Sequence, residues 1–408
     1  MKNYVILDCE TTIKNKGSPF TKSNKLCLVG LEDKDSHHEY DIEYSGTPYG
    51  DHLRDLSSRI RGADLLIGFN IKFDLHWIRR YIPDVRIPRI YDCQLAEFIL
   101  GNQGQSYPSL DKVCSDRGLG NKYDMVRVEY WENGIDTSDI PKQILSEYLR
   151  QDVMLTRKLF DQQRMELKGN QKQLFILQCE DLLILEEMEW NGMLYDKEKA
   201  KRLGLWTKDK ILTIDRRLSE LVDDSDINFS SDDHISCLLY GGSISIPTRE
   251  TYIRVLKNGS EKERERWAYR DSTFPQLVKP LRGTETKPTN SIVGEEELKR
   301  ANEARLLNGK RPFQRHFSVA EPILRQLKCT GKARKIIDLM LERSKLVKLD
   351  STYYTGLLNK FDINEWEDDK LHGQFNQCVA KTGRLSSSSP NLQNFSGEIK
   401  ELFYSRFV

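Results

Sequence analysis

The sequence predicts an α/β domain followed by a mainly helical region that contains an irregular insertion. Three observations predict this fold class. At 408 residues the chain is longer than a single hydrophobic core usually serves, so we expect two domains. Short apolar runs alternate with helical periodicity over the first ~165 residues, and long helical stretches follow Gly169. Gly, Pro, Thr and charged runs then dominate residues 241–312, which predicts turns and short strands there.

The expected elements follow from two periodicities. Short runs of apolar residues that end at charged turns are typical of strands, and the second run opens a hairpin at the edge of the sheet. Apolar residues three to four apart, such as Phe73, Trp77 and Tyr81, indicate helices. We expect strands at 4–7, 26–31 and 64–69, and helices at 72–81, 93–100, 138–168, 173–190 and 333–358. In the helix at 173–190 the expected apolar residues are Leu174, Leu177, Leu182, Ile184 and Met188.

Composition excludes several protein classes. Apolar residues make up 38% and charged residues 31% of the chain, which is typical of a globular protein with a wetted surface. The N-terminus turns acidic within a few residues, so we expect neither a signal peptide nor a spanning helix, and a cytoplasmic location. The eight cysteines are scattered singly, which argues against a zinc cluster or a disulfide framework. A net charge of +1 means that any nucleic-acid binding must depend on local basic patches.

Asp8 and Glu10 lie two residues apart at the end of the first expected strand. Their side chains therefore leave the same face of that strand. Two converging carboxylates repel each other unless a divalent cation lies between them, and their oxygens favour Mg²⁺ or Mn²⁺. Taken alone, such a pair is more often an exposed acidic turn.

Two further segments supply similar chemistry. Asp74 follows the strand at 64–69 on the turn into a helix, and an ordinary helix-capping segment is the alternative. Tyr148 and Asp152 are four residues apart, so they share one face of a helix. A solvated helix face with one buried tyrosine is the alternative for that pair.

Together these residues predict a two-metal phosphodiesterase site. In such sites two cations clamp the phosphate, one activating a water and the other steadying the leaving oxygen. We expect Asp8, Glu10 and Asp152 to hold the ions and Asp74 to hold a metal-bound water. Tyr148 would orient the attacking water, because the ordinary pKa of tyrosine, about 10, disfavours proton abstraction.

The segments DCET (8–11), GFNIKFD (68–74) and YLRQD (148–152) resemble the three motifs of the tyrosine-type DEDD exonucleases. The resemblance implies a ribonuclease-H-like fold and a 3′→5′ exonuclease domain at residues 1–168. It also implies that Thr11, Asn70 and Phe73 line the path of a single-stranded 3′ end. An aromatic ring can stack on any base, although plain core packing is an equal alternative for Phe73.

The segment HGQFNQCVAKTGRLSSSSPNLQNF (372–395) resembles the signature that precedes the palm of family A DNA polymerases. Guanidinium and amide groups can read the acceptors shared by all base pairs in the minor groove. A polar surface loop is the alternative. The resemblance implies contacts with the primer–template from Arg384, Asn391, Gln393 and Asn394.

Residues 185–196, 228–242 and 345–358 are similar to other parts of the same family. The resemblance assigns residues 169–408 to the N-terminal part of a family A polymerase domain, with the thumb and the start of the palm but without motifs A, B and C. Basic residues on the helix at 333–358 and just before it would face duplex phosphates, or they form a solvated face. They are Lys332, Arg334, Lys335, Arg343, Lys345 and Lys348.

The expected function combines these assignments. We expect a metal-dependent 3′→5′ proofreading DNA exonuclease that carries a DNA-gripping thumb and does not polymerise alone. A separate C-terminal chain with palm and fingers would then be its partner, as in a split phage polymerase. A truncated piece of a longer protein, a catalytically quiet DNA-docking subunit and an RNA 3′-trimming exonuclease are the alternatives.

Overall fold

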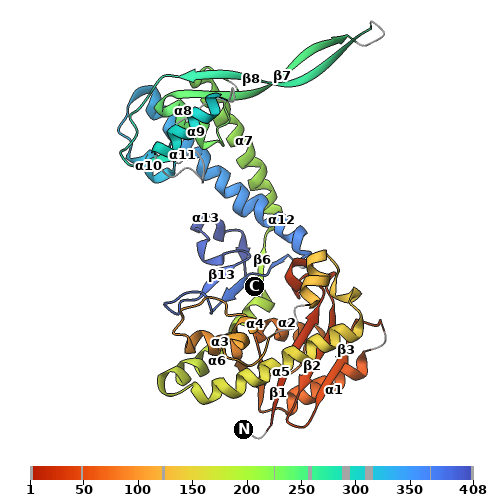
Figure 1. Cartoon of the computed structure of the whole chain (residues 1–408). Helices are drawn as coiled ribbons and strands as arrows, with labels where there is room; N and C mark the ends of the chain where they lie inside the picture. The colour runs from red at the N-terminus through yellow and green to blue at the C-terminus, as the bar shows by residue number, and fades with distance from the viewer. Residues whose placement is uncertain are drawn as a thin grey trace. The chain divides into compact units, whose positions relative to one another are not determined.

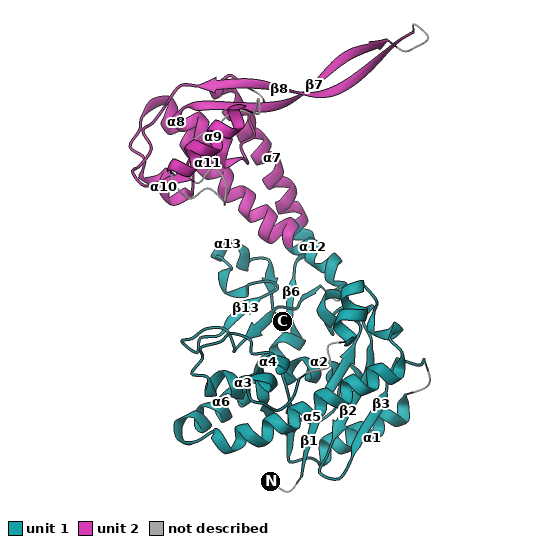
Figure 2. Ribbon diagram, viewed as in Figure 1, with its two compact units in different colours: residues 1–200, 357–408 teal, residues 201–356 magenta. Residues whose placement is uncertain are grey.

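The computed structural model describes residues 3–46, 49–121, 125–224, 226–255, 260–286, 295–307, 316–367 and 369–405. The chain forms two compact units (Figure 2). Unit 1 consists of Met1–Ala200 and Leu357–Val408, and unit 2 consists of Lys201–Gly356. None of the described helices is long and apolar enough to cross a bilayer.

A mixed five-stranded sheet lies at the centre of unit 1 (Figure 1). Its strand order is β3-β2-β1-β4-β5, with β1–β2 and β2–β3 antiparallel and β1–β4 and β4–β5 parallel. The nearly continuous burial of β2 shows that both faces of the sheet are covered. The strands are β1 (Tyr4–Thr11), β2 (Leu26–Glu32), β3 (His37–Asp41), β4 (Leu65–Gly68) and β5 (Arg89–Asp92).

Helices cover this sheet and connect its strands. The side chains of Val5, Ile6 and Leu7 on β1 are buried in the resulting core, which continues into α2, α3 and α5. The helices are α1 (Gly50–Gly62), α2 (Ile71–Tyr81), α3 (Cys93–Leu100), α4 (Leu110–Asp116), α5 (Lys142–Glu166) and α6 (Gly169–Asn191). Single turns of helix occur at Lys14–Gly17, Val126–Tyr130, Trp131–Asn133 and Thr137–Asp139.

Gly30 brings α5 close to the sheet. A Cβ on Gly30 would lie 2.9 Å from the side chain of Leu149 and 3.0 Å from that of Val153, so only glycine leaves room for α5 there. Gly30 pairs with Asp8 in the register of β1 and β2. Because paired residues of an antiparallel ladder share one face, Asp8 points toward α5.

The predicted elements of unit 1 are confirmed, with shifted ends. The predicted helix at 138–168 begins at Lys142, because residues Thr137–Asp139 form a separate turn and Pro141 precedes the helix. The predicted apolar face of α6 is wrong. Leu182 is buried, but Leu174, Leu177, Ile184 and Met188 are exposed, and α6 buries Phe175, Cys179, Leu185, Glu186 and Glu189 instead.

Within unit 1, residues 357–408 pack against the N-terminal part. The backbone N–H of Tyr107 donates to the carbonyl of Cys378 at 2.9 Å, and the hydroxyl of Ser106 donates to that of Val379 at 3.0 Å. The two compact units therefore have other boundaries than the predicted domains 1–168 and 169–408. The assignment of those domains to an exonuclease and a polymerase part stays a prediction. The elements are β6 (Met193–Tyr195), α12 (Thr355–Asn364), β11 (Lys370–Leu371), β12 (Gln374–Asn376), β13 (Ser386–Ser388), α13 (Gly397–Lys400) and β14 (Phe403–Tyr404).

Unit 2 has its own hydrophobic core. Ile336, Ile337 and Met340 on one face of α11 pack with Leu218 and Leu239. The predicted helix at 333–358 is confirmed as α11 and the start of α12, joined by a π-helical turn at Leu349–Tyr354. The helices are α7 (Lys197–Val222), α8 (Asp232–Tyr240), α9 (Glu295–Leu307), α10 (Glu321–Gln326) and α11 (Gly331–Lys348).

The predicted insertion of turns and short strands at 241–312 is wrong in its main feature. Strands β7 (Gly242–Val255) and β8 (Glu261–Phe274) pair along 14 residues each and extend beyond α8 and α9 as a two-stranded ribbon (Figure 1). Both faces of the outer ribbon are solvated, so no apolar alternation marks it in the sequence. Strands β9 (Glu285–Thr286) and β10 (His316–Phe317) form a short pair. Residues 256–259, 287–294 and 308–315 lie outside the described part.

Candidate metal centre and nucleic-acid interface

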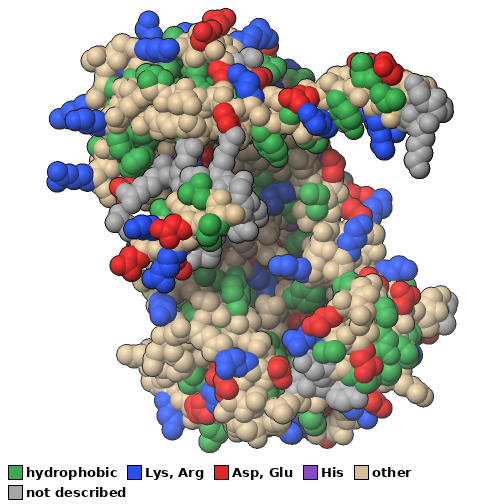
Figure 3. Space-filling model, turned by 45° about the horizontal axis from the view of Figure 1, so that its top comes forward, with side chains coloured by type: hydrophobic (Ala, Val, Ile, Leu, Met, Phe, Trp, Pro, Cys, Tyr) green, Lys and Arg blue, Asp and Glu red, His purple; other side chains and the backbone are tan. Residues whose placement is uncertain are grey.

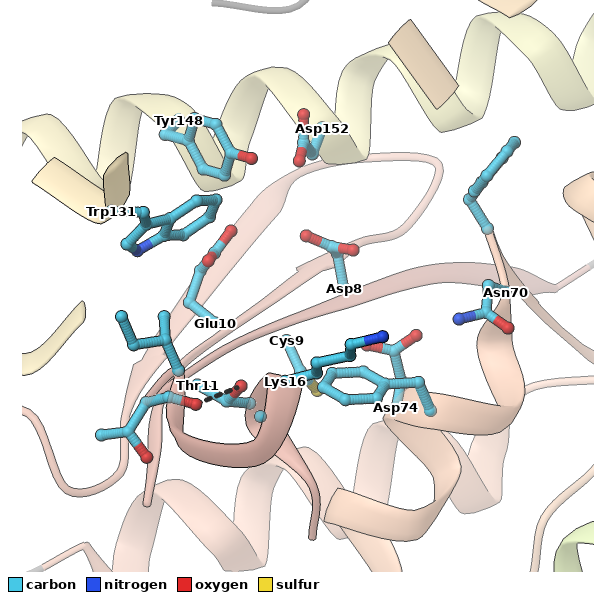
Figure 4. A pocket seen from close by; sticks show the side chains of 15 residues that line it. Asp8, Cys9, Glu10, Thr11, Lys16, Asn70, Asp74, Trp131, Tyr148 and Asp152 are labelled. Carbon is cyan, nitrogen blue, oxygen red and sulfur yellow. Dashed lines mark hydrogen bonds between the residues drawn. The ribbon is translucent and has the colours of Figure 1, made fainter. Parts of the chain in front are cut away.

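Three carboxylates from two elements of unit 1 meet at one point. Asp8 and Glu10 extend from β1, and Asp152 extends from α5 (Figure 4). One carboxylate oxygen from each lies within 4.8 Å of the others. Glu10 and Asp152 are buried and Asp8 is half-buried. The residues that the sequence predicts as ligands of the metal ions are therefore adjacent in space.

The chemistry of these donors fits a hard divalent cation. All three groups are carboxylates, which Mg²⁺ and Mn²⁺ prefer. Negative charges this close in a partly desolvated site repel one another, and a bound cation would remove that repulsion. One face of the cluster opens into a cavity of about 350 Å³, which gives room for ions and for part of a substrate.

Asp74 lines the same cavity but lies outside the group of three. It is on the first turn of α2, and its side chain is 3% exposed. Burial, and then the negative charge of Asp8, raise the pKa of the Asp74 carboxyl, although a hydrogen bond with Cys9 acts in the opposite direction. Its predicted role in holding a metal-bound water stays a prediction.

Tyr148 lies one helical turn before Asp152 on α5, and its hydroxyl points into the cavity (Figure 4). Its ring packs edge-on against Trp131, with centroids 5.6 Å apart. The indole N–H of Trp131 donates to the hydroxyl of Thr137 at 3.1 Å, which fixes the indole. Trp131 is thus a residue that positions Tyr148, and no pattern in the sequence distinguishes it.

The three residues predicted to contact a single strand also line the cavity. Thr11 and Asn70 are on its wall, and Phe73 both faces the cavity and packs against the core. Asn70 has a φ of 58°, a left-handed conformation that asparagine tolerates well. Asn70 therefore also has a structural role at the start of α2.

Asp92 and Lys16 were not predicted from the sequence. The Asp92 carboxylate accepts from the backbone N–H of Ile71 at 2.8 Å and of Leu95 at 2.9 Å, so it holds the first turns of α2 and α3 together. Lys16 is exposed and its ammonium reaches over the cavity (Figure 4). A cation there can contact a phosphate.

The loop that contains TGRLSS and PNLQN exposes all four predicted DNA-contacting side chains: Arg384, Asn391, Gln393 and Asn394. Two of the amides also support the loop. The Asn391 side chain accepts from the backbone N–H of Gln393 at 3.1 Å, and the Gln393 side chain donates to the carbonyl of Leu385 at 2.9 Å. Arg384 is the cation of this set.

The basic residues of α11 divide into two groups. Arg343 donates to both carboxylate oxygens of Asp215, at 2.6 and 3.4 Å, and to the carbonyl of Phe229, with a side chain only 12% exposed. The prediction that Arg343 faces DNA phosphates is therefore wrong. Arg334 pairs with Asp338 on the same helix. The exposed group is Lys332, Lys335, Lys345 and Lys348. Charges of both signs are interspersed on the face drawn in Figure 3, in keeping with the net charge of +1.

Comparison with known proteins finds a family match in the C-terminal part of the chain. A family model described as DNA polymerase family A matches residues 294–406. DNA polymerase I of Bacillus subtilis (strain 168) is 25% identical over 313 residues, which is 76% of this chain and 27% of that protein. DNA polymerase I of Helicobacter pylori (strain J99) is 53% identical over 58 residues, 14% of this chain and 6% of that protein.

A solved structure shows the same fold. The POL domain of Pol1 from M. smegmatis, in complex with a DNA primer–template and dNTP, matches with a TM-score of 0.62 and 16% identity. The match covers 98% of this chain and 54% of the solved chain. The chain therefore spans about half of that structure and about a quarter of the B. subtilis protein.

These comparisons correct the expected function. The sequence led us to expect an exonuclease subunit that does not polymerise alone and relies on a second chain for nucleotide addition. The matched family is that of the polymerase itself, and the fold likeness to a polymerase domain extends over nearly the whole chain. The expectation of an exonuclease without polymerase function is therefore wrong.

Proposed function

We propose that this chain, with residues 294–406 from DNA polymerase family A, serves template-directed DNA synthesis and binds primer–template DNA. The match of those residues to the family is the observation that carries the proposal. The solved domain of the same fold is bound to a primer–template and dNTP, which supports the choice of substrate. The chain spans only part of the length of these polymerases. Polymerase activity is therefore assigned to it as part of this proposal.

We assign the primer–template contact to the loop of Arg384, Asn391, Gln393 and Asn394. All four side chains are exposed. One of them, Arg384, carries a permanent positive charge, and the other three are amides. Amides can donate to the acceptors that every base pair presents in the minor groove, and a guanidinium can bind either those acceptors or a phosphate. Such contacts hold a duplex end without reading its sequence.

Binding and primer extension test this assignment. A labelled primer–template should bind more tightly than a single strand of the same length, and supplied dNTPs should extend the primer as the template directs. Arg384→Ala should weaken binding about tenfold, by the ~1–3 kcal/mol that a good guanidinium contact contributes. Lys381→Ala, an exposed cation three residues away, is the matched control. A protein with no preference for the junction and no extension would contradict the proposal.

A second candidate function is carried by the carboxylate cluster. Three carboxylates within 4.8 Å, next to a tyrosine and a cavity, support hydrolysis of phosphodiester bonds as an additional, editing activity of the same polymerase. The strand order β3-β2-β1-β4-β5 with β2 antiparallel agrees with a ribonuclease-H-like domain. In this proposal the editing centre would remove mispaired nucleotides from a 3′ end.

The residues of the cavity have distinct roles in such a reaction. Asp8, Glu10 and Asp152 would hold two Mg²⁺ or Mn²⁺ ions, and Asp74 would hold a water bound to one of them. Bound cations would supply charge neutralisation at the phosphate and acidify a nearby water. The Tyr148 hydroxyl would accept or donate a hydrogen bond to the attacking water and so set its direction. Phe73 would stack on the terminal base, while Thr11 and Asn70 would contact the strand.

Tyr148→Phe tests the editing centre, because it removes one hydroxyl and leaves the ring against Trp131. Release of the 3′ nucleotide from a mismatched primer should fall about 100-fold, because misplacing a reacting group by about 1 Å costs about that much in rate. Affinity for Mn²⁺ should not change, since Tyr148 is not a ligand. Tyr269→Phe, at an exposed tyrosine of unit 2, is the control. Equal release by Tyr148→Phe and wild type would contradict the assignment.

A further inference from the structure

The segment Glu261-Lys262-Glu263-Arg264-Glu265-Arg266 of β8 alternates strictly between acid and base. In a helix or an irregular loop this alternation mixes the charges. In a strand, successive side chains point to opposite faces, so the alternation separates them. The structure places all six residues in β8 of the ribbon.

The register of the ribbon assigns each side chain of its outer half to a face. Directly paired residues share a face, and the faces alternate along the ladder. One face presents Arg254, Lys262, Arg264 and Arg266 with a single carboxylate, Glu250. The other presents Glu261, Glu263 and Glu265 with a single cation, Arg249. We call the first of these the basic face and the second the acidic face of the ribbon.

Side-chain contacts agree with this division. On the basic face Arg266 pairs with Glu250 at 3.3 Å and lies over the ring of Tyr252, 5.5 Å from its centroid. On the acidic face Arg249 pairs with Glu265 at 3.2 Å. At its base the ribbon is anchored in unit 2, where Ile244 and Ile246 are buried in the core.

The basic face is not neutralised within the ribbon. Arg254 and Lys262 are directly paired, and like charges in that position destabilise a ladder. Within the described part of the chain, Arg254, Lys262 and Arg264 form no ion pair, and all three are exposed. A two-stranded ribbon is only marginally stable in water, so an uncompensated repulsion at its end indicates an anionic partner.

We propose that the basic face of the ribbon binds the phosphate backbone of duplex DNA, an inference that rests on the proposed primer–template function. Cations two residues apart on β8 are roughly 7 Å apart, so each reaches a different phosphate. The exposed edge of Tyr252 lies among them and adds contact area. The face contacts backbone rather than bases, so it adds affinity without sequence preference.

The first test measures binding of a blunt duplex of roughly two helical turns by fluorescence anisotropy across a range of salt. The variant R254Q/K262Q/R264Q should bind at least about tenfold more weakly at low salt, and its slope of log affinity against log salt should be less steep by about 2–3, near 0.9 per lost phosphate contact. Two matched controls remove three charges elsewhere. They are E261Q/E263Q/E265Q on the acidic face and R54Q/K112Q/K158Q on exposed positions of unit 1.

The outcomes separate this inference from the proposed function. If the wild type binds no DNA, the primer–template function itself is contradicted. If the wild type binds and R254Q/K262Q/R264Q behaves like R54Q/K112Q/K158Q, only the role of the ribbon is overturned. Retained DNA affinity together with lost binding to a polyglutamate probe would also overturn it, in favour of an acidic protein partner.

A second measurement does not depend on affinity. Seven of the eight native cysteines are buried and Cys329 is half-buried, so a new surface cysteine can be labelled selectively. A short photo-cross-linker at Lys262→Cys should attach to the duplex, whereas the same group at Glu263→Cys, the next residue on the opposite face, should not. Equal cross-linking from both positions would contradict a one-faced contact.

Discussion

The ammonium nitrogen of Lys72 lies 2.6 Å from Oε1 of Glu189, an ion pair that joins α2 to α6. The same Glu189 oxygen accepts from the backbone N–H of Phe375 on β12 at 2.5 Å, and Lys72 donates to the carbonyl of Phe375. Lys72 is two residues before Asp74, and Phe375 lies in the segment that matches DNA polymerase family A. The pair therefore links the helix of the carboxylate cavity to the segment that matches this family.

We predict that Lys72→Met destabilises unit 1 strongly. Glu189 is 2% exposed, and loss of its partner leaves a buried carboxylate without a cation. Burial already raises the pKa of Glu189, while Lys72 opposes that shift. The free energy of unfolding from urea titration should fall by about 3–5 kcal/mol.

The control for this prediction is an exposed pair of the same type. Lys112→Met breaks the pair with Asp116 on the surface of α4, and it should cost less than about 1 kcal/mol. The double variant K72M/E189L should recover most of the loss, because an apolar pair replaces the charges. Similar costs for Lys72→Met and Lys112→Met would show that the buried pair is not an anchor.

We predict opposite effects of Asp8→Asn and Glu10→Gln on stability and on hydrolysis. Each change removes one charge from three crowded carboxylates, so the melting temperature in EDTA should stay equal or rise. Added Mn²⁺ should raise the melting temperature of the wild type but not of these variants, because each variant lacks one carboxylate that binds the ion. The same variants should lose the proposed 3′ nucleotide release. Lower stability in EDTA than the exposed control Asp116→Asn would indicate a packing role instead.

Much of unit 1 is predictable because local patterns and tertiary packing agree there. The residues 4–7 carry an apolar run that the sheet buries, and Asp8 and Glu10 follow with the period of a strand. Asp92 was missed although it directly precedes the predicted helix at 93–100, a position where aspartate commonly caps a helix. Trp131 was missed because its contacts with Thr137 and Tyr148 follow from no sequence pattern. The ribbon was missed because strands solvated on both faces lack apolar alternation. In α6 the exposed Leu174 and Leu177 show that an apolar residue on a helix does not identify the buried face.

We predict that Gly30→Ala lowers the activity of the carboxylate cluster, although residue 30 is not part of that cluster. The added Cβ would meet the side chains of Leu149 and Val153 at about 3 Å, so α5 must move away from β2. Asp152 moves with α5 while Asp8 stays on β1, which widens the site. Overpacking of this kind costs about 1–3 kcal/mol, and 3′ nucleotide release should fall at least about tenfold.

Gly62→Ala is the matched control for Gly30→Ala. A Cβ on Gly62 in α1 meets nothing within 4 Å, and alanine favours a helix. That variant should be at least as stable as the wild type, with unchanged nucleotide release. A fully active Gly30→Ala variant would show that the close approach of α5 is not needed to assemble the site.

The last prediction concerns stability at mildly acidic pH. His76 on α2 is buried, and its Nε2–H donates to the carbonyl of Glu186 at 3.1 Å. Burial, and then the charge of Lys72, lower the pKa of His76 to about 3. The carboxylates of Glu186 and Glu189 lie 3.8 and 3.6 Å from the same nitrogen, yet burial outweighs their attraction for a proton.

Between pH values of about 3 and 6.5 the unfolded chain therefore binds a proton at His76 that the folded chain does not bind. The stability that the neutral ring contributes is complete above about pH 6.5 and is lost as the pH falls through this window. Relative to His76→Gln, the wild type should lose up to about 1.4 kcal/mol of unfolding free energy per pH unit. Urea titrations of both proteins at a series of pH values between neutral and mildly acidic measure this difference directly. A difference between the two proteins that does not vary with pH would mean that His76 is protonated in the folded state.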